Sequence, residues 1–187
     1  MKIRRITTGH DTNGKAVIAG DSEIDGIAIS LLPGAEFHRL WGADQPPHFP
    51  DAGSQPEGPS YFPPLGGFRF MMFTVAPNTM SRRAAVDRVA LQNEVDAKLP
   101  GLDLYMEPTN PGMHTTDTID FEYIISGEVW LELDDGAAVH LRAGDTVVQN
   151  GTRHRWRNEA AEPCRIVVFM VGTSRTPTGV EVARASV

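Results

Sequence analysis

The alternation of apolar and polar side chains predicts short β-strands over most of the chain. Asp135 and Gly136 favour a turn with positive φ, so residues 128–142 are expected to form a hairpin. Turn-forming residues separate the apolar runs at intervals of roughly 8–12 residues, a spacing typical of an all-β sandwich or barrel. From residue 102 onward, strands are expected near 103–107, 113–126, 128–134, 137–142, 145–149, 153–158 and 164–171.

The N-terminal third differs from the rest of the chain in its pattern of apolar runs and in its proline content. The runs "KAVIAG" and "GIAISLL" predict a few outer strands joined by turns. Residues 43–67 contain seven prolines and several glycines, so they are expected to form a long loop. Such loops serve as lids, partner-binding arms or linkers. We therefore expect residues 1–67 to pack as strands and a loop on a barrel formed by residues 68–187.

One segment carries a helical pattern. The sequence predicts a helix over residues 82–98 that ends at Leu99, before Pro100 and Gly101. Val86, Val89 and Ala90 are expected to lie on one stripe of this helix. Its mixed charges favour packing over the barrel, and we expect no role in recognition.

Composition excludes several functional classes. Hydrophobic residues make up 41% of the chain and charged residues 22%, as in an ordinary globular domain. The net charge is −7 and no window is rich in Lys and Arg, so nucleic acids and membrane surfaces are not expected partners. No signal-peptide pattern and no apolar run of about 18 residues is present. The only cysteine, Cys164, lies in an apolar strand and is expected to be inert, so a cytoplasmic location is expected.

The candidate chemistry follows from strand parity, because side chains alternate between the two faces of a strand. One face of the segment around residue 118 carries His114, Thr116, Thr118, Asp120 and Glu122. In the segment "TRHRWRN", the three arginines share one face, and the other face carries His154, Trp156 and Asn158. Since arginine favours water, the histidine face is expected to point inward. The interior must then hold a metal, a ligand or a dense hydrogen-bond network, because buried charge without partners is costly.

Residues 112–158 resemble the cupin superfamily, whose motifs are G-x5-H-x-H-x3-4-E-x6-G and G-x5-P-x-G-x2-H-x3-N. In the second motif, "GTRHRWRN" provides Gly151, His154 and Asn158, while the proline is absent and the spacing from Gly144 is one residue short. The first motif is degenerate: it retains a histidine and a glycine, with a threonine at the second histidine position and an aspartate at the glutamate position. These positions are His114, Thr116, Asp120 and Gly127.

The resemblance implies an all-β fold, the cupin-type double-stranded β-helix or jelly-roll barrel, here with an N-terminal strand extension and one short helix. It also implies a divalent metal, Fe, Mn, Zn or Ni, on His114, Asp120 and His154, while a metal-free interior with the same residues hydrogen-bonded is the alternative. Glu122 is a substitute ligand or a general acid or base. Thr116, Gln149 and Trp156 are expected to line a substrate pocket, with bracing of the turn as the alternative for Gln149 and core packing for Trp156.

Two functions remain open from the sequence. The first is a metal enzyme that oxygenates, decarboxylates or isomerises a small carbonyl, acid or phenolic substrate, with Glu122 as acid or base. The second is a module that binds or senses a small ligand without turnover. Because the N-terminal strands have no place in a minimal barrel, a homodimer formed by sheet extension is expected.

Overall fold

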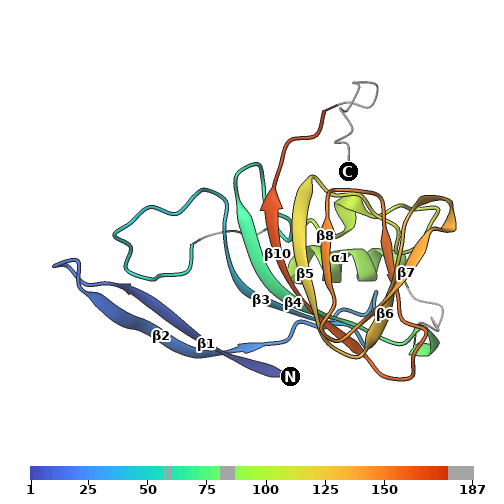
Figure 1. Ribbon diagram of the computed structural model, residues 1–187, viewed down its shortest axis with the longest axis horizontal. Coiled ribbons are helices and arrows are strands. Elements are labelled where there is room, and N and C mark those ends of the chain that lie inside the picture. Colours follow the sequence, from blue (N-terminus) through green and yellow to red (C-terminus); the bar gives the residue numbers. More distant parts are fainter. Residues whose placement is uncertain (57, 59, 81–86, 177–187) are drawn as a thin grey trace.

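The computed structural model describes residues 1–56, 58, 60–80 and 87–176 (Figure 1). Its single α-helix among these residues is α1, Arg88–Lys98. Short 3-10 turns span Asn78–Met80, Asp103–Tyr105 and Asp134–Gly136. The strands are β1 Lys2–His10, β2 Ala16–Asp25, β3 Glu36–Ala43, β4 Phe68–Val75, β5 Thr118–Ser126, β6 Glu128–Glu132, β7 Ala138–Arg142, β8 Thr146–Gln149, β9 Arg155–Arg157 and β10 Cys164–Gly172.

The strands form two facing sheets and a separate hairpin. A five-stranded sheet has the order β3-β4-β10-β5-β8, and a three-stranded sheet has the order β7-β6-β9. Strands β1 and β2 pair only with each other and project beyond β3 (Figure 1). All of the strand pairs are antiparallel. The fold is therefore all-β, a double-stranded β-helix with one helix, as the sequence predicted.

Burial along β5 follows the expected parity. Thr118, Asp120 and Glu122 are buried, whereas Phe121 and Tyr123 are exposed. Strand β10 alternates in the same way and is hydrogen-bonded between β4 and β5. The predicted inward face of residues 118–122 is confirmed, and its polar side chains point into the barrel.

The predicted hairpin over residues 128–142 is also confirmed. Strands β6 and β7 pair in register from Glu128 with Arg142 to Glu132 with Ala138. Between them, Asp135 and Gly136 both adopt positive φ angles, of 56° and 76°. The Asp-Gly pair therefore supplies the backbone conformation that a tight antiparallel connection requires.

Three predicted strand segments are not strands. In the run "GIAISLL", residues 26–32, only Ile27 pairs, in an isolated bridge with Phe37. Residues 103–107 were expected to be extended, but Asp103–Tyr105 forms a 3-10 turn, in which Leu104 is 79% exposed. Residues 113–117 lie outside β5, although His114 forms isolated bridges with Met106 and His154. Apolar residues alone do not make a strand here, because no neighbouring strand offers a continuous ladder of backbone partners.

Helix α1 begins later than predicted and buries a different stripe. Residues 82–86 lie outside the described part, so the structure says nothing of Val86. Asp87 is the N-cap, and its carboxylate accepts from the backbone of Val89 and Ala90. Val89 is 66% exposed and Ala90 is exposed as well, so the predicted stripe is wrong. The buried stripe repeats every fourth residue and consists of Leu91, Val95 and Leu99.

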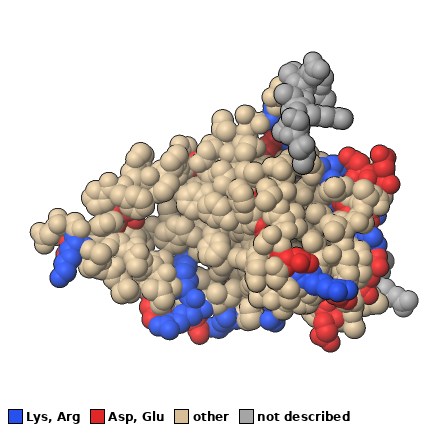
Figure 2. Space-filling view, viewed as in Figure 1, with Lys and Arg blue, Asp and Glu red and all other residues tan. Residues whose placement is uncertain are grey.

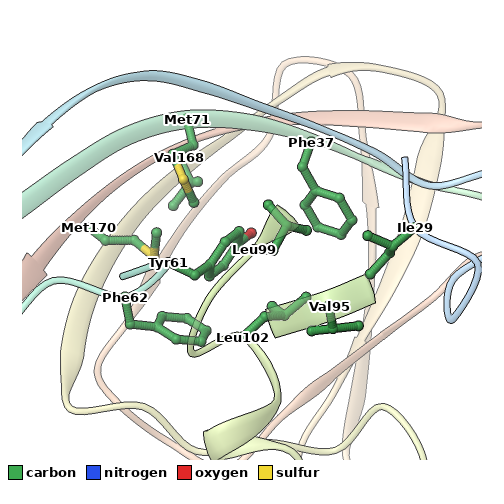
Figure 3. Packing of buried hydrophobic residues seen from close by; sticks show 10 residues of the cluster. All are labelled: Ile29, Phe37, Tyr61, Phe62, Met71, Val95, Leu99, Leu102, Val168 and Met170. Atoms are coloured by element: carbon green, nitrogen blue, oxygen red, sulfur yellow. The ribbon is translucent and has the colours of Figure 1, made fainter. Parts of the chain in front are cut away.

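The core has two apolar clusters, one on either side of the barrel interior. Figure 3 shows the larger cluster, in which Val95 and Leu99 from α1 pack toward side chains of the five-stranded sheet. Its other members are Ile29, Phe37, Tyr61, Phe62, Met71, Leu102, Val168 and Met170. The smaller cluster lies between the two sheets and consists of Ile124, Val129, Leu131, Leu141, Cys164 and Ile166.

The proline-rich segment is anchored to the barrel. Among its described residues, 44–67 contain no helix or strand, as predicted. Tyr61 and Phe62 are nevertheless buried, with ring centroids 4.9 Å apart. The buried Arg69 guanidinium donates to the carbonyl oxygens of Ser60 and Ala43, at 3.0 Å each. Since β3 also pairs with β4, the main sheet extends across the domain boundary expected at residue 67.

Candidate functional site: a cavity lined by histidines and acids

The barrel encloses a cavity of about 530 Å³. Its walls are mostly apolar, and they come from the main sheet and from the segments around residues 31, 61 and 106. The apolar walls include Phe37, Phe62, Phe73, Met106, Val168 and Met170. Two histidines and two acids also line the cavity, namely His114, His154, Asp120 and Glu122. A cavity of this kind suits a small molecule that is largely apolar and carries a polar group at one end.

The two histidines are direct neighbours. His114 and His154 form an isolated antiparallel bridge, in which each backbone N–H donates to the other's carbonyl at 2.9 Å. Their ring centroids lie 4.1 Å apart. This backbone pair brings together two residues from distant parts of the chain and turns both rings to the same cavity.

Each histidine ring is held by a backbone carbonyl. Nδ1 of His114 lies 3.0 Å from the Gly112 oxygen, and Nδ1 of His154 lies 2.9 Å from the Thr152 oxygen. Because a carbonyl oxygen only accepts, Nδ1 of His114 carries hydrogen and its Nε2 keeps a lone pair. Nδ1 of His154 faces both the Thr152 carbonyl and the Gln149 amide nitrogen, which lies 3.0 Å away, so these contacts do not fix its tautomer. Burial lowers the pKa of both rings, and burial together with His114 lowers the pKa of His154 to about 4. Both imidazoles are therefore neutral near pH 7.

The two acids are buried beside each other on β5. Asp120 and Glu122 are each 5% exposed. Burial raises the pKa of Asp120 to about 6. Burial and the nearby Asp120 raise the pKa of Glu122 well above its ordinary value. Asp120 Oδ1 and Glu122 Oε2 are buried without a hydrogen-bond partner among the described residues, so both atoms are free to meet a ligand.

Two of the three predicted pocket residues do not line the cavity. Thr116 is buried and its hydroxyl lies 2.8 Å from that of Thr118, outside the cavity lining. Gln149 is also absent from the lining: its amide donates to the Thr152 carbonyl at 2.9 Å and lies 3.0 Å from His154 Nδ1. Gln149 thus braces the turn before His154. Trp156 lines the cavity, with its ring 6.1 Å from that of His154.

The predicted metal ligands are only partly assembled. His114 and His154 are together, and Asp120 lines the same cavity. Within the described part of the chain, however, no three His, Cys, Asp or Glu side chains converge on one point. The donor types fit a divalent metal, and His114 donates Nδ1–H to a carbonyl so that its Nε2 is available as a ligand atom. The third donor is not in place.

Sequence reasoning missed several lining residues. Arg155 and Arg157 were expected to face water, but both line the cavity. Glu132 on β6 lies 2.5 Å from Arg155 Nη2 and 2.6 Å from Arg157 Nε, which compensates both charges. Tyr61 and Phe62 were hidden in the proline-rich segment, where the only signal was a pair of adjacent aromatic residues.

None of the described helices is long and apolar enough to cross a membrane.

Comparison with known proteins supports one family. Phomopsin biosynthesis cluster protein C' of Diaporthe leptostromiformis is 41% identical over 58 residues, which are 31% of this chain and 31% of that protein. The match thus spans less than a third of that relative's length. A cupin-domain-containing oxidoreductase, srdB of Neurospora crassa, is 24% identical over 173 residues, covering 89% of this chain and 72% of that protein.

A solved structure has a similar arrangement. A predicted oxalate decarboxylase from Thermotoga maritima has a TM-score of 0.42 and 14% identity, with coverage of 80% of this chain and 93% of that one. The model of the cupin domain matches residues 105–170, which include the bridge between His114 and His154. Residues 105–170 therefore form a cupin domain of the cupin superfamily.

Proposed function

We propose that this cupin is an enzyme that acts on a small organic substrate bound in the barrel cavity. The observation that carries the proposal is the lining of the cavity, which includes two adjacent neutral imidazoles and two buried acids that have unpartnered oxygens. Leaving such oxygens buried without a ligand costs free energy, which is typical of a site built for a function.

The walls favour a substrate with an apolar skeleton and an oxygen at one end. Phe37, Phe62 and Met170 can pack against carbon atoms, while His114 and Glu122 can meet a carbonyl, carboxyl or phenolic oxygen. The volume of about 530 Å³ admits a molecule of the size that cofactor and metabolite sites usually hold. The reaction class is oxygenation with dioxygen as co-substrate, decarboxylation or isomerisation. Similarity to a cupin-domain-containing oxidoreductase supports the first of these.

A divalent metal is the cofactor that we propose, held through Nε2 of His114 and His154 with Asp120 as the third ligand. Thr116 stands where the family pattern has another histidine, and its hydroxyl points to Thr118. When bound, Fe, Mn, Zn or Ni would supply a Lewis acid for a substrate oxygen.

Glu122 is the proton carrier in this proposal. Burial and the nearby Asp120 raise its pKa well above the ordinary value, so the carboxyl group keeps its proton to a higher pH and can pass it to a substrate oxygen or carbon. Phe73 and Met106 line the same cavity and give it apolar walls.

A second function is favoured by one observation. Within the described residues, no three donor side chains converge, and a cavity that binds an organic ligand without metal or turnover needs no such set. Under this reading, the acids and imidazoles hydrogen-bond to the polar end of the ligand.

Metal content separates the two functions. Protein purified without chelator or nickel resin should contain about one Fe, Mn, Zn or Ni per chain by elemental analysis. His114→Ala and His154→Ala should each lose that metal, whereas the matched control His140→Ala on β7 should retain it. A wild-type protein that binds none of the four ions after reconstitution would rule out the metal enzyme.

Turnover tests the role of Glu122. Wild-type protein and Glu122→Gln are incubated with small carboxylic acids, ketones and phenols, with and without dioxygen, and products are detected by mass spectrometry. For a substrate that the wild type consumes, Glu122→Gln should lower kcat by about 100-fold or more with little change in KM. An unchanged kcat would remove Glu122 from the chemistry.

A further inference from the structure

Tyr61 joins the proline-rich segment to the cavity. Its side chain is 6% exposed and lines the cavity, although the residue lies in neither sheet. Where this segment runs, the face seen in Figure 2 is largely tan and carries few Lys, Arg, Asp or Glu. Inside the barrel, by contrast, the segment presents a polar group, the phenol hydroxyl of Tyr61. A buried tyrosine hydroxyl usually meets a hydrogen-bond partner, in the protein or in a ligand.

Backbone and ring contacts hold Tyr61 in place. Its backbone N–H donates to the Pro100 carbonyl at 2.7 Å, just beyond the end of α1. Its ring packs edge to face against the rings of Phe62 and Phe37, with centroid distances of 4.9 Å and 5.9 Å. In Figure 3 the hydroxyl oxygen of Tyr61 lies in the middle of the labelled side chains. The direction of the hydroxyl is therefore set by the packing around the ring.

The Tyr61 ring lies close to the two acids of the cavity. It packs in one cluster with Val168 and Met170, whose side chains are buried on the inner face of β10. Val168 pairs with Glu122 on β5, and Met170 pairs with Asp120. Paired residues on neighbouring antiparallel strands lie roughly 5 Å apart. The phenol and the two carboxyl groups therefore line adjoining parts of the cavity wall.

The Tyr61 hydroxyl makes no hydrogen bond to any residue in the described part of the chain. Protein atoms do not enclose its oxygen completely, so the oxygen faces the open space of the cavity. Burial raises the pKa of the phenol above its ordinary value, Asp120 and Glu122 add to the rise, and Arg39 opposes it. The phenol thus stays protonated at neutral pH and offers its O–H as a donor. A buried donor without an acceptor costs free energy, which a ligand oxygen would recover.

We propose that the Tyr61 hydroxyl donates a hydrogen bond to a carbonyl oxygen of the bound substrate, and so selects ketones and carboxylic acids. This inference rests on the proposed function, because it takes the cavity as the binding place of a small organic substrate. Phe62 and Met170 line the cavity beside Tyr61 and pack against the carbon skeleton next to that oxygen. A compound with carbon in place of the oxygen leaves the hydroxyl without a partner and binds less tightly.

A matched pair of ligands tests the preference for a carbonyl oxygen. The probes are 2-acetylnaphthalene and 2-isopropenylnaphthalene, which have nearly the same shape but differ by a carbonyl oxygen against a CH2 group. In equilibrium dialysis at low probe concentration, the wild type should bind the ketone about 10-fold more tightly than the alkene. The same preference is expected before and after treatment with chelator, because the hydrogen bond needs no metal. Equal binding of the two probes, or binding of neither, overturns the proposal.

Tyr61→Phe removes only the hydroxyl. The variant should bind the ketone about 10-fold less tightly than the wild type and the alkene no less tightly, so the preference disappears. The matched control is Tyr105→Phe, since the Tyr105 ring packs on Phe62 at a centroid distance of 4.9 Å but does not line the cavity. Urea unfolding shows whether both variants are folded. A folded Tyr61→Phe that keeps the preference, or a Tyr105→Phe that loses it, overturns the proposal.

Infrared spectroscopy of the bound ketone gives a second readout that needs no substitution. With ¹³C at the carbonyl carbon, the C=O stretch in the wild type should lie at a lower frequency than in hexane, because a hydrogen bond weakens the C=O bond. A frequency equal to that in hexane overturns the proposal. Neither dialysis nor infrared spectroscopy needs turnover, so a negative result leaves the proposed enzyme standing. Conversely, a protein without metal or turnover removes the enzyme but still reports the ketone preference.

Discussion

Asp120 is the buried acid whose titration most directly links the cavity to pH. Its folded-state pKa is about 6, above the ordinary value of 3.8, because burial disfavours the charged form. An acid with a raised pKa stabilises the fold below its unfolded pKa and loses that contribution as pH rises through the folded value. The metal-free protein should therefore lose stability between about pH 4 and pH 6.

Asp120→Asn should remove this pH dependence in chelator-treated protein. A shift of this size corresponds to roughly 3 kcal/mol, so the variant should gain up to that amount over the wild type as pH rises from 4 to 7. Urea unfolding at both pH values measures the difference. The control Asp135→Asn, at an exposed position in the β6–β7 turn, should follow the wild type. Parallel stability curves for wild type and Asp120→Asn would contradict the prediction.

Cys164 provides an independent probe at the same scale. It is buried, and burial raises the pKa of its thiol to about 11. At pH 8 only roughly one molecule in a thousand would carry a thiolate. Iodoacetamide should thus leave the native protein unmodified over an hour and alkylate the single cysteine fully in urea. Alkylation is followed by intact mass spectrometry. Rapid alkylation of the folded chain would contradict the prediction and show that β10 opens at Cys164.

At the residue scale, parity predicted which side chains of β5 face inward. It failed for Arg155 and Arg157, because the preference of arginine for water is overridden when a carboxylate lies within reach. Glu132 on β6 is that carboxylate, and pairing of β6 with β9 brings it there. Strand partners are not encoded in the local pattern of either segment.

At the scale of elements, the orientation of helix α1 depends on where its N-cap starts the helix as well as on its apolar residues. Asp87 sets the first turn, and the residues that then face the sheet are Leu91, Val95 and Leu99. The sequence correctly indicated a helix that ends near Leu99. It did not place the stripe, because several apolar residues compete and only contact with the sheet decides among them.

Two matched substitutions test this stripe. Val95 is 0% exposed, so Val95→Ala should lower the free energy of unfolding by roughly 2 kcal/mol through lost burial and a small cavity. Val89→Ala, at a position that is 66% exposed, should change it by less than about 0.5 kcal/mol. Urea unfolding gives both values. Equal effects of the two substitutions would mean that the helix presents another face to the core.

At the scale of the whole molecule, the cavity unites segments that are far apart in the sequence. The N-terminal part supplies β3 and the Tyr61–Phe62 pair, and the cupin domain supplies the two histidines and the two acids. A ligand that binds only the folded barrel must therefore stabilise all of these segments together.

Thermal unfolding tests this linkage with a metal ion as probe. If the proposed site binds Mn²⁺ or Zn²⁺, a concentration 100-fold above the dissociation constant should stabilise the wild type by about 2.7 kcal/mol and raise Tm by several degrees. His154→Ala should show no such shift, whereas His140→Ala should behave like the wild type. An equal rise in Tm for His154→Ala would assign the binding to another site.

The all-β fold, the 128–142 hairpin and the inward face of β5 could be predicted from the amino-acid pattern, because they follow from local turn chemistry and the two-residue period of a strand. Three features emerge only in the folded barrel: the 4.1 Å ring distance between His114 and His154, the position of Thr116 and Gln149 outside the cavity lining, and that of Arg155 and Arg157 within it. The physical reason is that such contacts depend on which strands pair across the barrel, and pairing is a property of the whole chain.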